Sequence, residues 1–251
     1  MTDLKYELHK QMIQSVRNVI DDKKIGIAFS GGVDSSLLAR ICKHLGYDIT
    51  LLTVGFTGSH DIEFSKQVST MLGYKHRIGK ISPKTFPQVV KKIKKIIKSD
   101  NLSWNENCIA FYHIAKLARR YHIRKIITAN GIDELFCGYN GYRVAIEKGE
   151  NEVMRLMKSK IKNEINMMEA VNTVVSEFEV EIVQPFLSKD FIDFAKKISV
   201  KEKIHGPDDL IRKHIVRELA FEIGVPKGAS FKRKKALQYG TLIHKTLMKL
   251  K

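Results

Sequence analysis

The residues best suited to chemistry lie in a short turn near the start of the chain. The string Ser30-Gly31-Gly32-Val33-Asp34-Ser35-Ser36 follows an apolar run from Ile25 to Phe29. Gly31 and Gly32 permit positive φ and carry no Cβ, so consecutive backbone N–H groups there can converge on an anion. The serine hydroxyls and the start of the following helix add donors and partial positive charge. The order strand, turn, helix therefore predicts a phosphate-binding loop.

An acid distinguishes this turn from the common phosphate loop, GxxxxGK[ST], in which a lysine reaches the outer phosphates. Here the turn carries an acid, Asp34, where the common loop has that lysine. An acid beside phosphates is useful when it holds Mg²⁺, because the ion then supplies the charge of opposite sign. We therefore expect Asp34 to bind Mg²⁺.

A second turn repeats this pattern about a hundred residues later. Gly131-Ile132-Asp133-Glu134 follows the run Arg124–Asn130, which has the composition of a buried strand. The carboxyl ends of parallel strands meet in one crevice, where α/β sheets bind their ligands. We expect the two glycine turns to face each other across a single site.

Strands and helices must alternate to bring these turns together, and the apolar pattern predicts that they do. Strands are expected at 25–29, 48–56, 74–78 and 124–130. Helices are expected at 3–21, at 35–44, from the loop 57–61 to residue 72, at 86–98, at 109–118, within 140–176 around an exposed connection at 147–149, and at 190–198. Pro207 with the two aspartates after it indicates the start of another helix, and Gly224 and Pro226 indicate its end. The alternation predicts an α/β fold with a doubly wound parallel sheet.

Composition excludes several classes of protein. The chain of 251 residues is 43% hydrophobic, enough for a sizeable core. No apolar run approaches the roughly 18 residues that a membrane helix needs, and acids interrupt the N-terminal segment, so we expect a cytoplasmic protein without a membrane partner. Its three scattered cysteines, Cys42, Cys108 and Cys137, form no CxxC motif and argue against a disulfide framework or a closed zinc site.

The strong positive charge has two interpretations. A net charge of +17 and a pI near 9.7 attract polyanions, including nucleotides and RNA. The segment 86–98 has one apolar stripe, and its other face carries Lys91, Lys92, Lys94, Lys95 and Lys98. Such a helix fits an RNA or membrane surface, or a packed helix whose lysines are merely solvated.

The motifs, taken in order, resemble a known family. SGGVDSS resembles the PP-loop of the ATP pyrophosphatases, which release pyrophosphate and pass AMP to a substrate oxygen. With TVGFTGSHD, NGIDELFCGY, EIVQPFL and VPKGASFKRKKALQYG, it resembles the synthetase domain of glutamine-dependent asparagine synthetases, a domain that β-lactam synthetases share. This resemblance implies a nucleotide-binding core over 1–139 and a mostly helical lobe over 140–251 that completes the active site.

The resemblance also implies roles for particular residues. Pyrophosphate is expected on the loop of Ser30, Gly31, Gly32, Asp34, Ser35 and Ser36, and Gly131 on the second turn is also expected to bind the nucleotide. Adenine is expected near Val54 and Thr128. The catalytic residues that the resemblance implies are Asp34, Asp133, Glu134 and Lys234. Asp133 is expected to help Asp34 hold Mg²⁺, with Glu134 beside it, and Lys234 aligns with the lysine that approaches the α-phosphate. ATP and Mg²⁺ are the cofactors implied.

The chain also departs from the family pattern. The family motif GEGxDE carries an acid that is a candidate base for the ammonia step, and Asn130 stands in its place; Glu134 and Glu181 are the acids considered as replacements. In the ExRxPFLD motif the arginine has become Val183 and the final acid Ser188, and Cys137 replaces a glycine of FGGY. No glutaminase domain is recognisable. These changes affect the recognition of aspartate and the activation of ammonia more than they affect adenylation.

Three functions remain open on the sequence. The first is adenylation of an acceptor other than simple aspartate, with attack by free ammonia or by ammonia from a separate glutaminase subunit. The second is adenylation of a tRNA base for amination or thiolation, where Cys108 or Cys137 would handle sulfur. The third is a degenerate nucleotide-binding module that regulates a partner. Release of pyrophosphate in response to aspartate with ammonia, or to tRNA, separates these functions.

Overall fold

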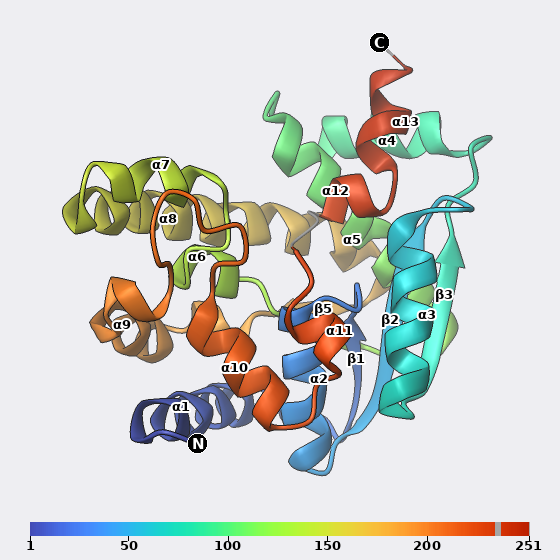
Figure 1. Ribbon diagram of the computed structural model, residues 1–251. Coiled ribbons are helices and arrows are strands. Elements are labelled where there is room, and N and C mark those ends of the chain that lie inside the picture. The colour runs from blue at the N-terminus through green and yellow to red at the C-terminus, as the bar shows by residue number, and fades with distance from the viewer. Residues whose placement is uncertain (234–236, 251) are drawn as a thin grey trace.

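Parallel strands form the centre of the molecule, and they are β1 (Lys24–Ala28), β2 (Asp48–Gly55), β3 (His76–Lys80), β4 (Lys125–Ile127) and β5 (Glu181–Val183). The structure is a computed structural model that describes residues 1–233 and 237–250. The sheet has the order β3-β2-β1-β4-β5, and every neighbouring pair is parallel (Figure 1). The expected doubly wound α/β fold is confirmed.

Helices surround this sheet. They are α1 (Asp3–Val19), α2 (Val33–His44), α3 (His60–Leu72), α4 (Phe86–Ile97), α5 (Leu102–Arg120), α6 (Ile132–Leu135), α7 (Gly141–Glu147), α8 (Glu150–Val175), α9 (Lys189–Lys197), α10 (His214–Glu222), α11 (Lys227–Ser230), α12 (Leu237–Gly240) and α13 (Ile243–Met248). Short 3-10 helices lie at Ser176–Phe178, Pro185–Leu187 and Val200–Glu202. Among the described residues, no helix is both long and apolar enough to cross a bilayer.

Alternate residues of the strands point into two apolar cores, one on each face of the sheet. Ile25 and Ile27 of β1 pack with side chains of α1, α2 and α10, whereas Leu52 and Val54 of β2 pack with those of α4, α5 and α8. Strands that are buried on both faces are expected to be apolar throughout, as these are. Helices packed on both faces therefore support the sheet from which the two glycine turns begin.

One expected strand ends earlier than the apolar pattern suggests. The strand expected at 124–130 pairs only as far as Ile127, because the chain turns at Gly131, where φ is +105°. A Cβ at Gly131 would lie 2.7 Å from the carbonyl oxygen of Phe186, so only glycine fits. The helical region 140–176 is broken between α7 and α8 at Gly149, where φ is +100°, which is the connection expected at 147–149.

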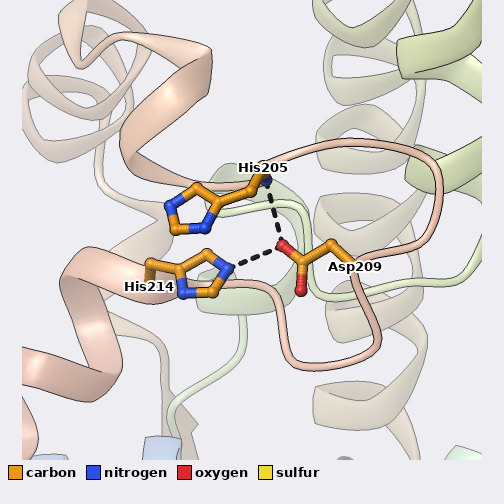
Figure 2. A group of neighbouring side chains, drawn as sticks. All are labelled: His205, Asp209 and His214. Atoms are coloured by element: carbon orange, nitrogen blue, oxygen red, sulfur yellow. Dashed lines mark hydrogen bonds and ion pairs between the residues drawn. The ribbon is translucent and has the colours of Figure 1, made fainter.

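The helix expected from Pro207 begins only at His214, and the segment 205–213 before it is a loop (Figure 2). Asp209 Oδ1 accepts hydrogen bonds from the backbone N–H groups of Ile211 and Arg212, both at 2.9 Å. Arg212 and Lys213 have positive φ, 51° and 56°. The aspartate thus binds local backbone donors outside a helix, a known competitor of helix formation.

The later half of the chain contributes to the sheet as well as to the helices around it. β5 pairs with β4, Ile182 opposite Ile126, and α10 packs against α2. The division into 1–139 and 140–251 stays a prediction.

Candidate active site

A cavity of about 300 Å³ lies at the carboxyl ends of β1, β2 and β4. Many predicted site residues line it: Ser30, Gly32, Asp34, Ser35, Val54, Thr128, Asp133 and Glu134. Gly31, Ser36 and Gly131 are absent from the lining. The two glycine turns therefore meet across one cavity, as the sequence predicts.

The first turn, residues 30–36, is held by its own serine side chains. Ser35 Oγ accepts from the backbone N–H of Ser30 and donates to the carbonyl oxygen of Gly32, both at 3.3 Å. Fully buried Ser36 donates to the carbonyl oxygen of Gly31, also at 3.3 Å. At Gly31 φ is +78°, and a Cβ there would lie 3.1 Å from Ser65 Cα. Gly31 and Ser36 thus shape the turn from behind, and α2 begins directly after it.

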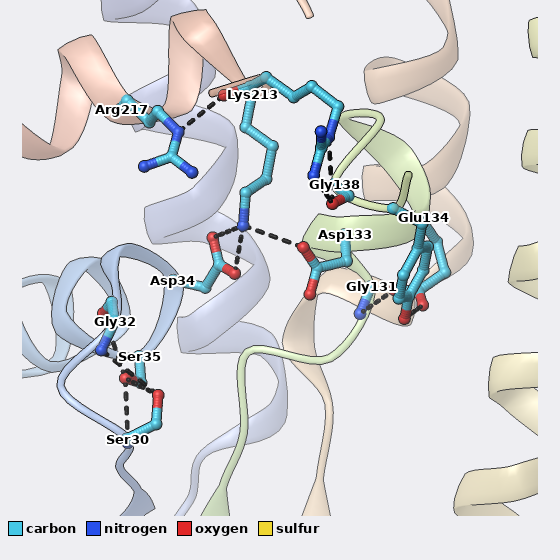
Figure 3. Close-up of polar contacts among 12 residues, drawn as sticks. Ser30, Gly32, Asp34, Ser35, Gly131, Asp133, Glu134, Gly138, Lys213 and Arg217 are labelled. Atoms are coloured by element: carbon cyan, nitrogen blue, oxygen red, sulfur yellow. Dashed lines mark hydrogen bonds and ion pairs between the residues drawn. The ribbon is translucent and has the colours of Figure 1, made fainter. Parts of the chain in front are cut away.

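A lysine joins the two turns (Figure 3). Lys213 Nζ lies 2.8 and 2.6 Å from the two carboxylate oxygens of Asp34 and 2.9 Å from Asp133 Oδ1. Its side chain is 1% exposed. Burial by itself lowers the pKa of Lys213, but the attraction of Asp133 and Asp34 outweighs it and leaves this pKa raised. The carboxylates predicted to bind Mg²⁺ therefore converge on one buried cation.

A second cation from α10 reaches the same cavity. Arg217 is 1% exposed, and its Nη1 donates to the carbonyl oxygens of Ser230 and Lys232 at 2.7 and 2.9 Å. Its Nη2 is buried without a hydrogen-bond partner among the described residues. A buried unpaired donor is costly. Because Arg217 lines the cavity, an anion bound there can satisfy that donor.

Glu134 holds the second turn closed. Its Oε2 accepts from the backbone N–H of Gly131 at 3.1 Å, and its Oε1 accepts from the hydroxyl of Tyr139. The hydroxyl of Tyr142 donates to the backbone carbonyl of Glu134 at 2.5 Å. These bonds orient α6, and with it Asp133. The geometry favours a positioning role for Glu134; the catalytic role given to it on the sequence stays a prediction.

An acid that the motif analysis missed stands beside Asn130. Glu164 on α8 is 6% exposed, and its Oε1 accepts a hydrogen bond from Asn130 Nδ2 at 2.5 Å. Glu181, considered as a replacement base, lies at the far end of β5 with its side chain 61% exposed and paired with Lys125. Glu164 interrupts the apolar stripe of α8 between Ile161 and Met168, and that interruption is the signal that the sequence offered.

Basic side chains complete the cavity wall. Lys160, Lys232 and Arg233 line it, and Lys232 Nζ lies 3.4 Å from the centre of the Phe64 ring. Lys234, predicted to approach the α-phosphate, lies outside the described residues. Burial raises the pKa of both Cys108 and Cys137 to about 12, so neither thiol is a ready nucleophile.

Comparison with known proteins identifies the family. The Asparagine synthase family matches residues 7–179, more than half of the chain. The chain belongs to this family, which confirms the resemblance found in the motifs.

Individual relatives are distant. A provisionally assigned glutamine-hydrolysing asparagine synthetase 1 from Methanocaldococcus jannaschii is 26% identical over 97% of this chain and 50% of its own. The glutamine-hydrolysing asparagine synthetase B of Escherichia coli K12 is 24% identical over 94% of this chain and 45% of its own. The chain thus spans half or less of the length of these relatives. Among solved structures, an NH3-dependent NAD synthetase from Campylobacter jejuni matches 54% of this chain and 58% of its own, at 19% identity and a TM-score of 0.37.

Proposed function

We propose that this chain is an ATP pyrophosphatase that adenylates an acceptor oxygen for attack by a nitrogen nucleophile. The observation that carries the proposal is the convergence of Asp34, Asp133, Lys213 and Arg217 under the glycine turn. ATP would place its phosphates against residues 30–36 and its adenine near Val54 and Thr128. The open donor of Arg217 is the place for a phosphate oxygen.

Mg²⁺ fits the donor set of this site. Asp34 and Asp133 offer carboxylate oxygens close enough to contact one ammonium group, and carboxylates are ligands that Mg²⁺ prefers. The ion would neutralise phosphate charge when bound. Lys213 would then turn from the carboxylates to the phosphates, supplying the positive charge that the turn itself lacks.

Adenylation is the first step. An acceptor oxygen attacks the α-phosphorus of ATP, the bond from that phosphorus to the α–β bridging oxygen breaks, and pyrophosphate leaves. Charge grows on the phosphate oxygens during this step, where fixed cations stabilise a transition state by about 3 kcal/mol each. Arg217 is held by buried contacts and needs little rearrangement to act in this way, whereas Lys213 acts once it has turned from Asp34 to the phosphates.

Transfer to nitrogen is the second step. The nitrogen nucleophile displaces AMP and must lose a proton as its new bond forms. Asn130 cannot accept that proton, but its side-chain partner Glu164 is a carboxylate within the same cavity. We assign the role of proton acceptor to Glu164. Free ammonia or a separate glutaminase subunit would supply the nitrogen.

The acceptor binds between α5 and α8 in this proposal. That end of the cavity offers the polar side chains of Ser103, Asn107 and Asn163, the cation Lys160, and an apolar wall that includes Phe111 and Met167. An acceptor with an anionic or amide group and an apolar body fits this lining. Val183 and Ser188, which replace the family's arginine and acid, disfavour simple aspartate.

The test is direct. The full chain is incubated with ATP, Mg²⁺, ammonia and candidate acceptors, and the nucleotide products are separated. AMP with pyrophosphate is expected. ADP with phosphate would exclude adenylation, and no turnover with any acceptor while ATP binds would favour the regulatory module.

A tRNA acceptor is the second candidate, and the face of α4 favours it. Lys91, Lys92, Lys94 and Lys95 are exposed there, although Lys92 is paired with Glu177. Each phosphate neutralised by a protein cation adds about 0.7–0.9 to the slope of log K against log salt. Replacing the four lysines with glutamine should flatten that slope for tRNA. Absence of tRNA binding at low salt would exclude this acceptor.

A further inference from the structure

Two histidines and an aspartate gather at the loop that precedes α10, outside the residues that line the cavity. One ligand atom from each of His205, Asp209 and His214 lies within 4.8 Å of the others. His214 Nε2 is 2.6 Å from Asp209 Oδ2. The two imidazole rings are stacked, with centroids 3.5 Å apart and planes 4° apart (Figure 2).

The carboxylate of this cluster is held in place before any ligand arrives. Its Oδ1 accepts from the N–H groups of Ile211 and Arg212, and its Oδ2 accepts from the N–H of His205 at 3.0 Å. The ring of His214, the first residue of α10, is held by its hydrogen bond to Asp209 Oδ2. The ring of His205 is exposed, and no hydrogen bond joins it to another side chain that the structure describes. Two of the three candidate metal ligands, Asp209 and His214, are therefore held by hydrogen bonds, and the third, the ring of His205, can turn.

We infer that His205, Asp209 and His214 bind one transition-metal dication of the zinc type, separate from the Mg²⁺ expected at Asp34 and Asp133. Two imidazoles and a carboxylate suit Zn²⁺, Co²⁺ or Ni²⁺, whereas Mg²⁺ prefers oxygen ligands alone. Zn²⁺ takes tetrahedral ligands at about 2.0–2.1 Å, which places two ligand nitrogens about 3.4 Å apart. The ligand atoms of the cluster lie within 4.8 Å of one another, so side-chain rotation can bring them to that spacing.

Binding requires the two imidazole rings to leave their parallel stack, because a metal ion lies in the plane of each imidazole that binds it. The exposed ring of His205 rotates so that one of its nitrogens faces the ion. The proton that His214 Nε2 shares with Asp209 is released to solvent, because a metal-bound imidazole nitrogen carries none. Water occupies the fourth position on the open side.

The ion would join both ends of the loop 205–213, which carries Lys213 into the cavity. The loop already rests on the turn after α6, since the Arg212 guanidinium donates to the carbonyl oxygen of Gly138 at 3.2 and 3.3 Å. Closing the loop at its base would restrict its opening further. We therefore expect slower hydrogen exchange at the amides of Ile211 and Arg212 when the ion is bound.

The test uses the full chain in excess Mg²⁺, titrated with Co²⁺ as a spectroscopic probe. One equivalent should give the visible absorption of tetrahedral Co²⁺, and Zn²⁺ should displace it. His205→Ala changes an exposed ring only, and His214→Ala removes a second ligand; each should weaken Co²⁺ binding by about 100-fold or more. The control is the double variant His9→Ala/His44→Ala, which removes another neighbouring histidine pair and should bind as the parent does.

Hydrogen exchange gives an independent readout, because it requires no catalytic activity. The site is confirmed when Zn²⁺ protects Ile211 and Arg212 in the parent and fails to do so in His205→Ala. The inference is overturned if the parent shows no tetrahedral Co²⁺ spectrum, or if both histidine variants bind Co²⁺ as tightly as the parent. Failure of this site would leave the proposed ATP chemistry untouched.

Discussion

The glycine turn at 30–36 and the segment 203–217 build the same cavity by opposite means. In the turn, hydrogen bonds link residues no more than five positions apart. In the later segment, Lys213 meets Asp34 from 179 positions away. The turn is thus a local backbone structure, whereas the cations depend on α10 packing against α2. Seven consecutive residues are enough to form the phosphate-binding turn, but the cation that pairs with its acid is brought there by tertiary structure.

A comparison within the segment 203–217 sharpens this point. Lys203 and Lys213 are both buried almost completely. Lys213 has two carboxylates and a raised pKa. Lys203 has the carbonyl oxygen of Ala195 at 2.7 Å and the ring of Phe136, and burial lowers its pKa to about 8. The same side chain is stabilised as a cation in one place and penalised in the other.

Removing the acid of the local turn should have the largest effect. Asp34→Ala takes away a Mg²⁺ ligand and the partner of Lys213, so pyrophosphate release should fall by about a thousandfold. Turnover is measured with an acceptor that stimulates pyrophosphate release in the product assay proposed above, and circular dichroism checks the fold. Asp48→Ala, at an exposed ion pair with Lys75, is the control. Undiminished pyrophosphate release in Asp34→Ala would refute the assignment of the site.

Removing the long-range cation should destabilise the nucleotide-free protein. Lys213→Met leaves the carboxylates of Asp34 and Asp133 without the ammonium between them, which should lower the free energy of unfolding by about 3 kcal/mol. Mg²⁺ should recover part of this loss, since the ion can bind the same carboxylates. Urea denaturation with and without Mg²⁺ measures both effects. A stability equal to that of the parent would show that the bridge is energetically neutral.

Removing the proton acceptor proposed on α8, Glu164, should slow only the transfer to nitrogen. Glu164→Gln keeps the shape but removes the base, so transfer to nitrogen should slow by about 100-fold while pyrophosphate release continues. Rapid quench separates the two steps. Glu169→Gln, on the exposed face of the same helix, is the matched control. Equal losses in both steps would point to a structural role for Glu164.

The smallest expected effect is an increase in stability, opposite in sign to the effect expected of Lys213→Met. Lys203→Met removes a cation that burial penalises, and it should stabilise the protein by about 2 kcal/mol at pH 7. The pKa of Lys203 is about 8 when folded and 10.5 in the unfolded reference. The unfolded chain therefore binds more protons between these values, and the parent gains stability as pH rises through that window. The advantage of the variant should shrink from pH 8 to 10.5; an advantage independent of pH would contradict this origin.

Much of the fold was predictable because its signals are local. The β-branched runs and the helical periodicity placed β1, β2, α1 and α4 within a few residues of their observed bounds. The start of α10 was wrong, because Asp209 uses its carboxylate on backbone donors and keeps the chain out of a helix until His214. Glu164 was missed because the sequence shows only an acid within an apolar stripe. Its place in the site depends on its contact with Asn130, which is 34 positions away in the chain.

The sequence by itself determined the glycine turns, the acids that follow them and the family, because each of these depends on neighbouring residues. Only the tertiary structure decided which cations lie beside those acids. Among more than forty lysines and arginines in the chain, nothing local distinguishes Lys213 and Arg217. They are selected because α10 packs on α2, which brings Lys213 just before the helix and Arg217 within it to the cavity, where burial makes an unpaired charge costly and a paired one specific.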